Sequence, residues 1–254
     1  MLNKKYFYHQ AIRRAIVAFG MVFNDIQIQR RDANGNPIQS LKVPLAYGPK
    51  QKFLSRLYEN PDLEDSKVQI TLPRMGFEMT NLLYDAQRKA NTLQTKRLVG
   101  STGDNASYQY SAVPYTMDLS LHVFAKNQDD ALQVVEQIIP FFTPALNLSV
   151  KAVPDMEIVD DFPVILQDVS FEDDYEGDFA SRRSIIYTLN FQIKLNFYGP
   201  IEERGVIKKV EVNNYLSTDT TFIDNRYEVA VDPLDASPND AYGFDETFTD
   251  TPDL

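Results

Sequence analysis

The chain has 254 residues, of which 43% are hydrophobic and 24% charged, an ordinary composition for a globular protein. Its length allows one large domain or two small ones, with a sizeable core in either case. It contains no cysteine, which excludes disulfides, thiolate metal sites and cysteine nucleophiles. His9 and His122 are its two histidines, and this argues against a multi-histidine metal site or a Ser-His-Asp triad.

The N-terminal stretch does not have the pattern of a targeting segment. Arg13 and Arg14 interrupt its apolar run, and no small-residue cleavage site follows, so we expect no secretion signal. No unbroken run of about 18 apolar residues occurs, and the sequence therefore predicts no membrane-spanning helix. These features indicate a soluble protein made in a cytoplasm.

The net charge of −11 is unevenly distributed along the chain. Residues 1–97 hold 16 Lys/Arg and 8 Asp/Glu, whereas residues 98–254 hold 9 and 28. Within the second part, residues 211–254 contain 11 acidic side chains and one basic one. Such an acidic chain is a poor candidate for tight duplex DNA binding, which depends on phosphate neutralisation. This uneven charge distribution suits head-to-tail stacking of the protein against a charged partner. The alternative is that the acidic C-terminal residues form a solvated tail that meets no partner.

Apolar spacing predicts four elements in the first third of the chain. Apolar residues at three- and four-residue spacing predict a helix over residues 6–23. A hairpin is expected next, with its turn at Asn34-Gly35 and a return strand from Ile38 to Tyr47. A short helix follows, with Pro49 in its first turn. Residues 66–86 alternate as a strand that is broken at Pro73.

Residues 98–114 show no periodicity and predict a long loop. The next segment, 115–124, alternates as a strand that carries His122 on its polar face, and we interpret this histidine as structural. A helix is then expected from the cap at Asn127 to Ile139, ended by Pro140. Its predicted buried positions are Leu132, Val135, Ile138 and Ile139.

Phe141 and Phe142 follow this helix between two prolines. The stretch is too short to span a membrane, and the two rings predict a packing corner. Each buried ring contributes about 1.5–3 kcal/mol, enough to attach the corner to the sheet of the same chain or to a neighbouring subunit. Both alternatives remain open from the sequence.

A hairpin is predicted over residues 162–198. Its second strand is expected to be the longest of the chain, with one buried face made by seven in-phase residues: Ile185, Tyr187, Leu189, Phe191, Ile193, Leu195 and Phe197. The acidic turn over 172–178 lacks the spacing of a calcium-binding loop. Arg182 and Arg183 lie beside this turn, where they form either a local ion-pair cluster or a contact with a partner.

Gly199-Pro200 marks the expected domain boundary. We predict an α+β domain over residues 1–200, with a mostly antiparallel sheet flanked by helices, and an acidic C-terminal arm over 201–254. The arm shows little periodicity and carries scattered aromatic residues, among them Tyr242 and Phe244. Acidic segments with interspersed aromatics suit an arm that becomes ordered on a partner.

The sequence lacks the motifs of the common enzyme classes. It has no Walker loop, no Gly-x-Gly-x-x-Gly, no Gly-x-Ser-x-Gly and no metal-binding histidine pair. The Gly-rich loop at residues 100–104 lacks the lysine and the following helix of a phosphate loop. We therefore expect no catalytic residue, no cofactor and no metal site, and do not interpret the protein as an enzyme.

Five stretches, "AIRRAIVAFGMVFNDIQIQR", "VPLAYGPKQKF", "VQITLPRM", "VVEQIIPFFTP" and "SRRSIIYTLNFQI", occur in this order. Together they resemble the tail sheath stabiliser family of T-even-type contractile-tailed phages, which is also described as the proximal tail completion or tail terminator family. The resemblance covers residues 6–200. It implies a tail-terminator-like fold, a twisted sheet flanked by helices, and a virion protein whose activity is mechanical.

The resemblance further implies a hexameric ring at the head-proximal end of the tail. Such a ring caps the sheath, sits on the tube terminator and offers a surface to the neck and head-completion proteins, while DNA passes through its channel without being read. Alternatives are another ring of the tail or neck, or a binding module outside the virion. The candidate interface residues are Arg13, Arg14, Phe141, Phe142, Arg182, Arg183, Tyr242 and Phe244.

Overall fold

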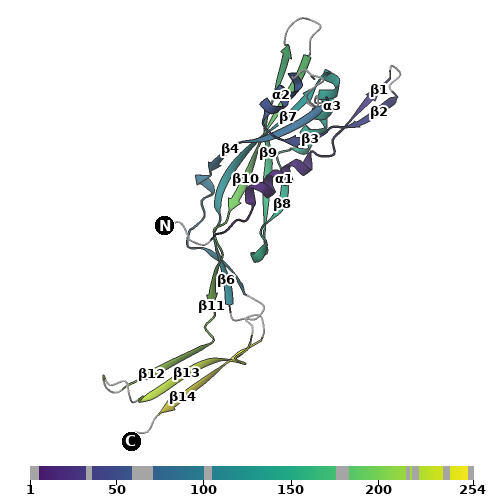
Figure 1. Cartoon of the computed structure of the whole chain (residues 1–254). Coiled ribbons are helices and arrows are strands. Elements are labelled where there is room, and N and C mark those ends of the chain that lie inside the picture. The colour runs from purple at the N-terminus through teal and green to yellow at the C-terminus, as the bar shows by residue number, and fades with distance from the viewer. Residues whose placement is uncertain are drawn as a thin grey trace, which may run out of the picture. The chain divides into compact units, whose positions relative to one another are not determined.

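The computed structural model describes residues 6–32, 36–58, 71–99, 105–175, 183–215, 218, 223–236 and 241–250. The chain divides into two compact units. The larger unit comprises residues 8–90 and 112–198, and the smaller unit comprises residues 1–7, 91–111 and 199–254. The chain therefore leaves the larger unit at residue 91, returns to it at 112, and leaves it again after Tyr198 (Figure 1).

The larger unit is built on a six-stranded, curved sheet with the strand order β3-β4-β7-β10-β9-β8 (Figure 1). All its neighbouring strands are antiparallel except the parallel pair β3–β4. The strands are β3 (Leu45–Tyr47), β4 (Arg74–Tyr84), β7 (Val113–Ala125), β8 (Leu146–Val153), β9 (Ile158–Tyr175) and β10 (Arg183–Phe197). The prediction of a mostly antiparallel α+β sheet with flanking helices agrees with this architecture, although strands predominate.

Strand β10 lies at the centre of the sheet, between β7 and β9. Its predicted buried face is confirmed: Leu189 and Phe191 are almost fully buried and stand opposite Leu121 and Leu119 of β7. Alternation places every second residue of these strands on the same face, so the two central strands form one continuous apolar surface.

The longest strand, however, is β9 with 18 residues, and β10 has 15. The pairing register of β9 against β10 shifts between Leu166 and Asp168, which leaves one extra residue in β9. Such a bulge changes which face each later side chain points to. The alternation along β9 is therefore broken, and the sequence underestimated the strand's length.

Helix α1 (Ala11–Val22) supplies the centre of the core. Phe19 and Phe23 are buried, and their rings lie 5.2 and 5.5 Å from the ring of Phe191. The helix begins later than the predicted residue 6, because Gln10 adopts a left-handed conformation with φ 57° immediately before it. A left-handed residue cannot continue a right-handed helix, so residues 6–10 lie outside α1.

Helix α3 (Gln128–Ile138) also packs against the apolar face, and two of its four predicted buried residues, Val135 and Ile138, are buried there. Ala131, Val134, Val135 and Ile138 are its buried apolar residues, whereas the predicted Leu132 and Ile139 are 37% and 42% exposed. Ile139 keeps helical angles despite the following proline, and the chain continues as a 3₁₀ turn, η2 (Ile139–Phe141). Helical angles are disfavoured, but not forbidden, for the residue before a proline. Here packing outweighs that preference.

A separate two-stranded ribbon precedes β3. It consists of β1 (Gln27–Arg31) and β2 (Pro37–Lys42), while the predicted turn at Asn34-Gly35 lies outside the described residues. The expected return strand to Tyr47 is divided at Val43-Pro44, because Leu45–Tyr47 forms β3 and pairs with β4 instead. Helix α2 (Lys50–Tyr58) and the start of β4 directly after Pro73 agree with the prediction.

Short 3₁₀ turns complete the larger unit, namely η1 (Ala86–Arg88) and η3 (Pro154–Met156). The three α-helices are divided between the two faces of its sheet. Helices α1 and α3 pack on the apolar face with Phe191, whereas Phe53 of α2 packs with Phe124 and Ile186, which point to the other face. The polar face of the sheet is thus covered by α2 at one end.

The smaller unit contains two three-stranded antiparallel sheets. The first consists of β11 (Glu202–Gly205), β6 (Asn105–Tyr110) and β5 (Thr95–Val99), in that order. The expectation of a loop over 98–114 was therefore wrong, since two strands form there by pairing with each other and with β11. Such long-range pairing leaves no local periodic signal.

The second sheet consists of β12 (Lys209–Asn214), β13 (Asn225–Asp232) and β14 (Gly243–Asp250) in sequence order. We name it the C-terminal sheet. In the described part of residues 201–254, where the sequence showed little periodicity, β11, β12, β13 and β14 are thus formed.

Candidate functional site

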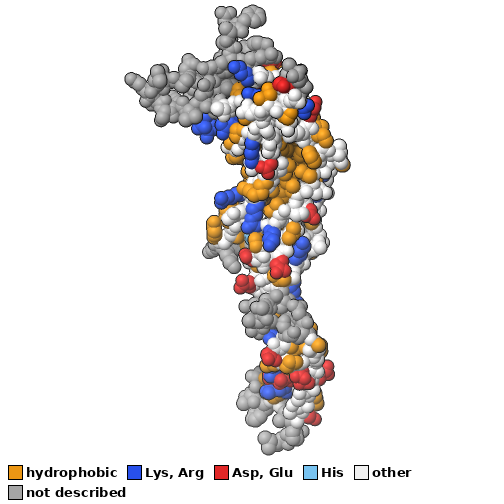
Figure 2. Space-filling model, turned by 90° about the vertical axis from the view of Figure 1, so that its right-hand side faces the viewer, with side chains coloured by type: hydrophobic (Ala, Val, Ile, Leu, Met, Phe, Trp, Pro, Cys, Tyr) orange, Lys and Arg blue, Asp and Glu red, His pale blue; other side chains and the backbone are white. Residues whose placement is uncertain are grey.

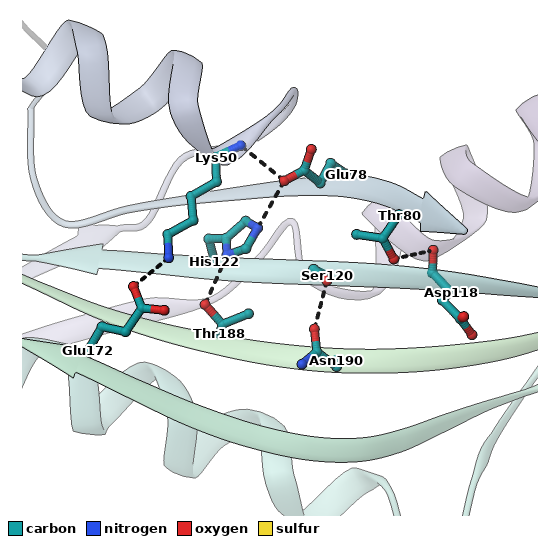
Figure 3. A network of polar contacts seen from close by, with 9 residues as sticks. All are labelled: Lys50, Glu78, Thr80, Asp118, Ser120, His122, Glu172, Thr188 and Asn190. Atoms are coloured by element: carbon teal, nitrogen blue, oxygen red, sulfur yellow. Dashed lines mark hydrogen bonds and ion pairs between the residues drawn. The ribbon is translucent and has the colours of Figure 1, made fainter. Parts of the chain in front are cut away.

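A polar network lies on the face of the central sheet that is turned away from α1 and α3. Figure 3 shows its side chains, which project from β4, β7, β9 and β10 and from the start of α2. His122 of β7 lies opposite Thr188 of β10, and its ring also contacts Glu78 of β4, so side chains from three strands meet at this point.

His122 is at the centre of this network and is 4% exposed. Its Nδ1 lies 3.0 Å from Oγ1 of Thr188, and its Nε2 lies 3.4 Å from Oε1 of Glu78. The same Glu78 oxygen accepts a hydrogen bond of 3.1 Å from the backbone N–H of Lys50, at the first turn of α2. Glu78 therefore connects the histidine to the helix that covers it, while the Lys50 ammonium pairs with Glu172 on β9.

Burial lowers the pKa of His122 below its ordinary value, and the nearby Glu78 opposes this shift without reversing it. The imidazole is therefore neutral at pH 7 and makes one hydrogen bond through each nitrogen. Further along the same face, the Ser120 hydroxyl and the Asn190 amide oxygen are 2.7 Å apart. Satisfied buried polar contacts of this kind hold strands in register, which supports the structural interpretation of His122.

The chemistry of this network does not suggest a metal centre. Among the described residues, no group of three or more His, Asp and Glu side chains is arranged to hold a metal ion.

Two predicted interface pairs are divided between the surface and the interior. The Arg14 guanidinium donates hydrogen bonds to the backbone carbonyls of Lys151 and Ala152 on β8, the second at 3.3 Å, whereas Arg13 is exposed. Likewise Phe142 is 8% exposed and its ring lies 5.0 Å from that of Phe191, whereas Phe141 is 69% exposed. One member of each pair is thus available to a partner.

The remaining predicted interface residues lie at two places. Arg182 falls outside the described residues, and Arg183 begins β10 opposite Tyr175, with its side chain also outside the description. Tyr242 and Phe244 are 45% and 64% exposed, and their rings meet edge to face at 5.8 Å. Their role at an interface stays a prediction.

The sequence analysis missed an exposed apolar face on the C-terminal sheet. The register pairs Val212 with Tyr227 and Tyr227 with Phe248, so these side chains share one face. The full set, which we name the apolar face of the C-terminal sheet, is Val210, Val212, Tyr227, Val229, Val231, Phe244 and Phe248. Alternation in "KVEV", "RYEVAV" and "GFDETF" was the signal that could have revealed it.

The opposite face of the C-terminal sheet is polar and carries ion pairs. Lys209 lies 2.7 Å from Glu228, and Arg226 lies 3.2 Å from Glu211. Figure 2 shows acidic and hydrophobic side chains together on the smaller unit. The C-terminal sheet is therefore amphipathic, with one face suited to water and one that is only partly covered in the isolated chain.

A family model for the tail sheath stabiliser of T4-like Myoviridae viruses matches residues 6–252 of the chain. The chain belongs to this tail sheath stabiliser family. A curated relative, the tail completion protein gp15 of Enterobacteria phage T4, is 28% identical over 256 residues, which cover 96% of this chain and 93% of the relative. The family resemblance inferred from the sequence is thus confirmed, and the match extends beyond residue 200.

Membership of the family makes this a structural protein of a bacteriophage tail, associated with other tail components of the virion. Among the described residues, no helix is long and apolar enough to cross a membrane.

Proposed function

We propose that the protein forms a hexameric ring at the head-proximal end of a contractile phage tail, where it caps and stabilises the sheath. In this role it sits on the tube terminator and provides the docking surface for the neck and head-completion proteins. DNA passes through the channel of the ring without being read. The observation that carries the proposal is the match to the tail sheath stabiliser family over residues 6–252.

Physical features of the chain support an assembly role. Large apolar side chains are exposed in both units, for example Phe141 and Met21 in the larger unit and Phe244 and Phe248 in the smaller one. Concentrations of exposed apolar residues mark surfaces that meet other proteins. Strand β14 is also an edge strand of its sheet, and such edges are used for association between chains.

Residues 201–254 have a distinct part in the proposal. They form an acidic arm that docks on a neighbouring subunit, the sheath ring or the neck, and residues 1–200 form the assembly domain. The concentration of 11 acidic residues against one basic residue in 211–254 supports docking on a basic surface, in an association that weakens with salt.

The experiment is electron microscopy of the purified protein, alone and after mixing with assembled sheath. Sixfold rings with a central hole, bound at one end of the sheath, are the expected result. Compact monomers that never associate with sheath or neck proteins at any concentration would refute the proposal. A chain that ends at Ile207 retains β11 and removes the C-terminal sheet, so it tests the arm separately: it should fold but bind its partners less tightly.

A further inference from the structure

We propose that the apolar face of the C-terminal sheet packs against the outer surface of helix α1 of a second copy of this chain. The inference rests on the proposed function, since it identifies one subunit contact of the ring. The occupant is α1 of a second copy, because its outer surface is complementary to this face in both apolarity and charge.

The apolar face of the C-terminal sheet is open over its whole width. Val210 and Val212 of β12 are 50% and 45% exposed, and Phe244 and Phe248 of β14 are 64% and 63% exposed. Between them, Tyr227 of β13 is 37% exposed. A sheet of only three strands gains stability when one face is covered by another layer, and each of these five side chains is at least 37% exposed.

Two acidic side chains of β14, Glu246 and Asp250, are directed to this face, and Glu246 is the one between the aromatic residues. Glu246 lies two residues from both Phe244 and Phe248 on β14, so alternation directs it to the same side of the sheet. It acts on Tyr227, whose pKa is raised by burial and by the neighbouring Glu246 carboxylate. A partner that covers this face must therefore offer apolar contact together with a positive charge.

The outer surface of α1 has this combination. Arg13, Val17 and Met21 follow one another at intervals of four residues and so lie along one side of the helix. Val17 is 47% and Met21 is 70% exposed, and Arg13 is exposed beside them. Within the part of the chain that the structure describes, Arg13 makes no hydrogen bond or ion pair, whereas the Arg14 guanidinium donates to backbone carbonyls of β8.

Figure 2 shows the side of the larger unit on which α1 lies in Figure 1, with Lys/Arg and hydrophobic side chains next to one another. The two surfaces match when Arg13 meets Glu246 and the apolar residues of each cover the other. Two C-terminal sheets packed face to face would instead bring their Glu246 carboxylates together, and like charges in an apolar contact are unfavourable.

A contact between different surfaces of identical chains is heterologous. Repetition of such a contact produces a ring when the rotation between subunits closes. The contact is therefore compatible with a closed assembly, whereas a face-to-face pairing of two C-terminal sheets would stop at a dimer.

The absence of cysteine from the native chain allows a direct test by cross-linking. A Phe248→Cys chain is mixed with a Val17→Cys chain and treated with a short bismaleimide. We expect a covalent dimer that contains one copy of each variant. The matched control replaces Phe248→Cys by Thr247→Cys, whose side chain is on the opposite, polar face of β14, and we expect it to give little mixed dimer.

A charge exchange tests the specific pairing. Arg13→Glu and Glu246→Lys should each weaken self-association about threefold to tenfold, as the loss of one coupled charge pair does. The chain that carries both substitutions should recover most of the original association in sedimentation experiments, because it restores the attraction with reversed sign.

The inference is overturned if the Phe248 and Thr247 variants give equal yields of mixed dimer, or none. It is likewise overturned if a chain carrying both Phe248→Cys and Val17→Cys is linked only within itself, since the occupant is then the same copy. If sixfold rings form but Phe248→Cys and Val17→Cys chains are not cross-linked, this contact is refuted and the proposed function stands. Failure to form rings with sheath present would count against the proposed function instead.

Discussion

The replacement of Gly76 by alanine should test the packing of α2 on the sheet. Gly76 lies in β4, and the ring of Phe53 from α2 sits directly on it. A Cβ added at Gly76 would lie 2.4, 2.8 and 2.9 Å from the Cε2, Cζ and Cδ2 atoms of that ring. Ordinary contacts of a Cβ are 3.4–4 Å, so the ring must move by about 1 Å, in the range of overpacking in a filled core.

The magnitude follows from what holds Phe53 in place. Its side chain is 8% exposed and packs with Phe124 and Ile186, and complete loss of that burial would cost about 1.5–3 kcal/mol. Alanine recovers about 0.5–1 kcal/mol, because it reduces the freedom of the unfolded chain relative to glycine. The expected cost of Gly76→Ala is therefore about 1–3 kcal/mol, as overpacking usually gives.

Urea unfolding, followed by circular dichroism, measures this change in the free energy of unfolding. Gly205→Ala is the control, since a Cβ there meets nothing within 4 Å, and it should be neutral or slightly stabilising. In a chain that already carries Phe53→Leu, Gly76→Ala should cost less stability than in the native chain. The leucine side chain is smaller than the phenylalanine ring and leaves room for the added Cβ. Equal stability of the Gly76→Ala and Gly205→Ala chains would refute the packing described for α2.

Three further predictions concern the core and the polar network. Phe191→Ala should cost about 3–5 kcal/mol of unfolding free energy, and Gln192→Ala on the opposite face under about 0.5 kcal/mol; similar costs would contradict the assigned faces. Phe142→Ala should also cost about 3–5 kcal/mol and Phe141→Ala, at an exposed position, under about 0.5 kcal/mol, as thermal unfolding can show. Because the pKa of His122 lies below its ordinary 6.5, the unfolded chain takes up the proton first, so stability should fall as the pH drops below 6.5. His122→Gln should flatten that part of the pH dependence, and an unchanged slope would refute the contribution.

Much of the central sheet followed from the sequence because its strands obey a simple period. In β10, side chains two residues apart go to the same face, and the in-phase residues from Ile185 to Phe197 required a half-buried strand. The sequence also predicted the polar face of β7, which carries His122. It did not predict that this face is buried, because the burial depends on α2 and the ring of Phe53, which come from another part of the chain.

The candidate surfaces were only partly predictable. The sequence marked Phe141 and Phe142 together, but the 3₁₀ turn at Ile139–Phe141 directs one ring into the core and leaves the other exposed. It also marked Tyr242 and Phe244 without showing the sheet that contains Phe244. Alternation in its three strands indicated strands with one apolar face, but which strands pair, and therefore which side chains share a face, is set by the register of β13 against β12 and β14.

The sequence by itself determined the class of the protein, the main helices, the faces of the two central strands and the family resemblance, because each depends on residues close together along the chain. Only the tertiary structure decided that residues 95–99 and 105–110 form strands, where the sequence predicted a loop over 98–114. Strand β6 there pairs with β11, whose first residue, Glu202, stands opposite Tyr108 although it is far away in sequence. The hydrogen bonds and burial that stabilise such a strand come from its distant partner, so the strand's own residues need not carry a periodic signal.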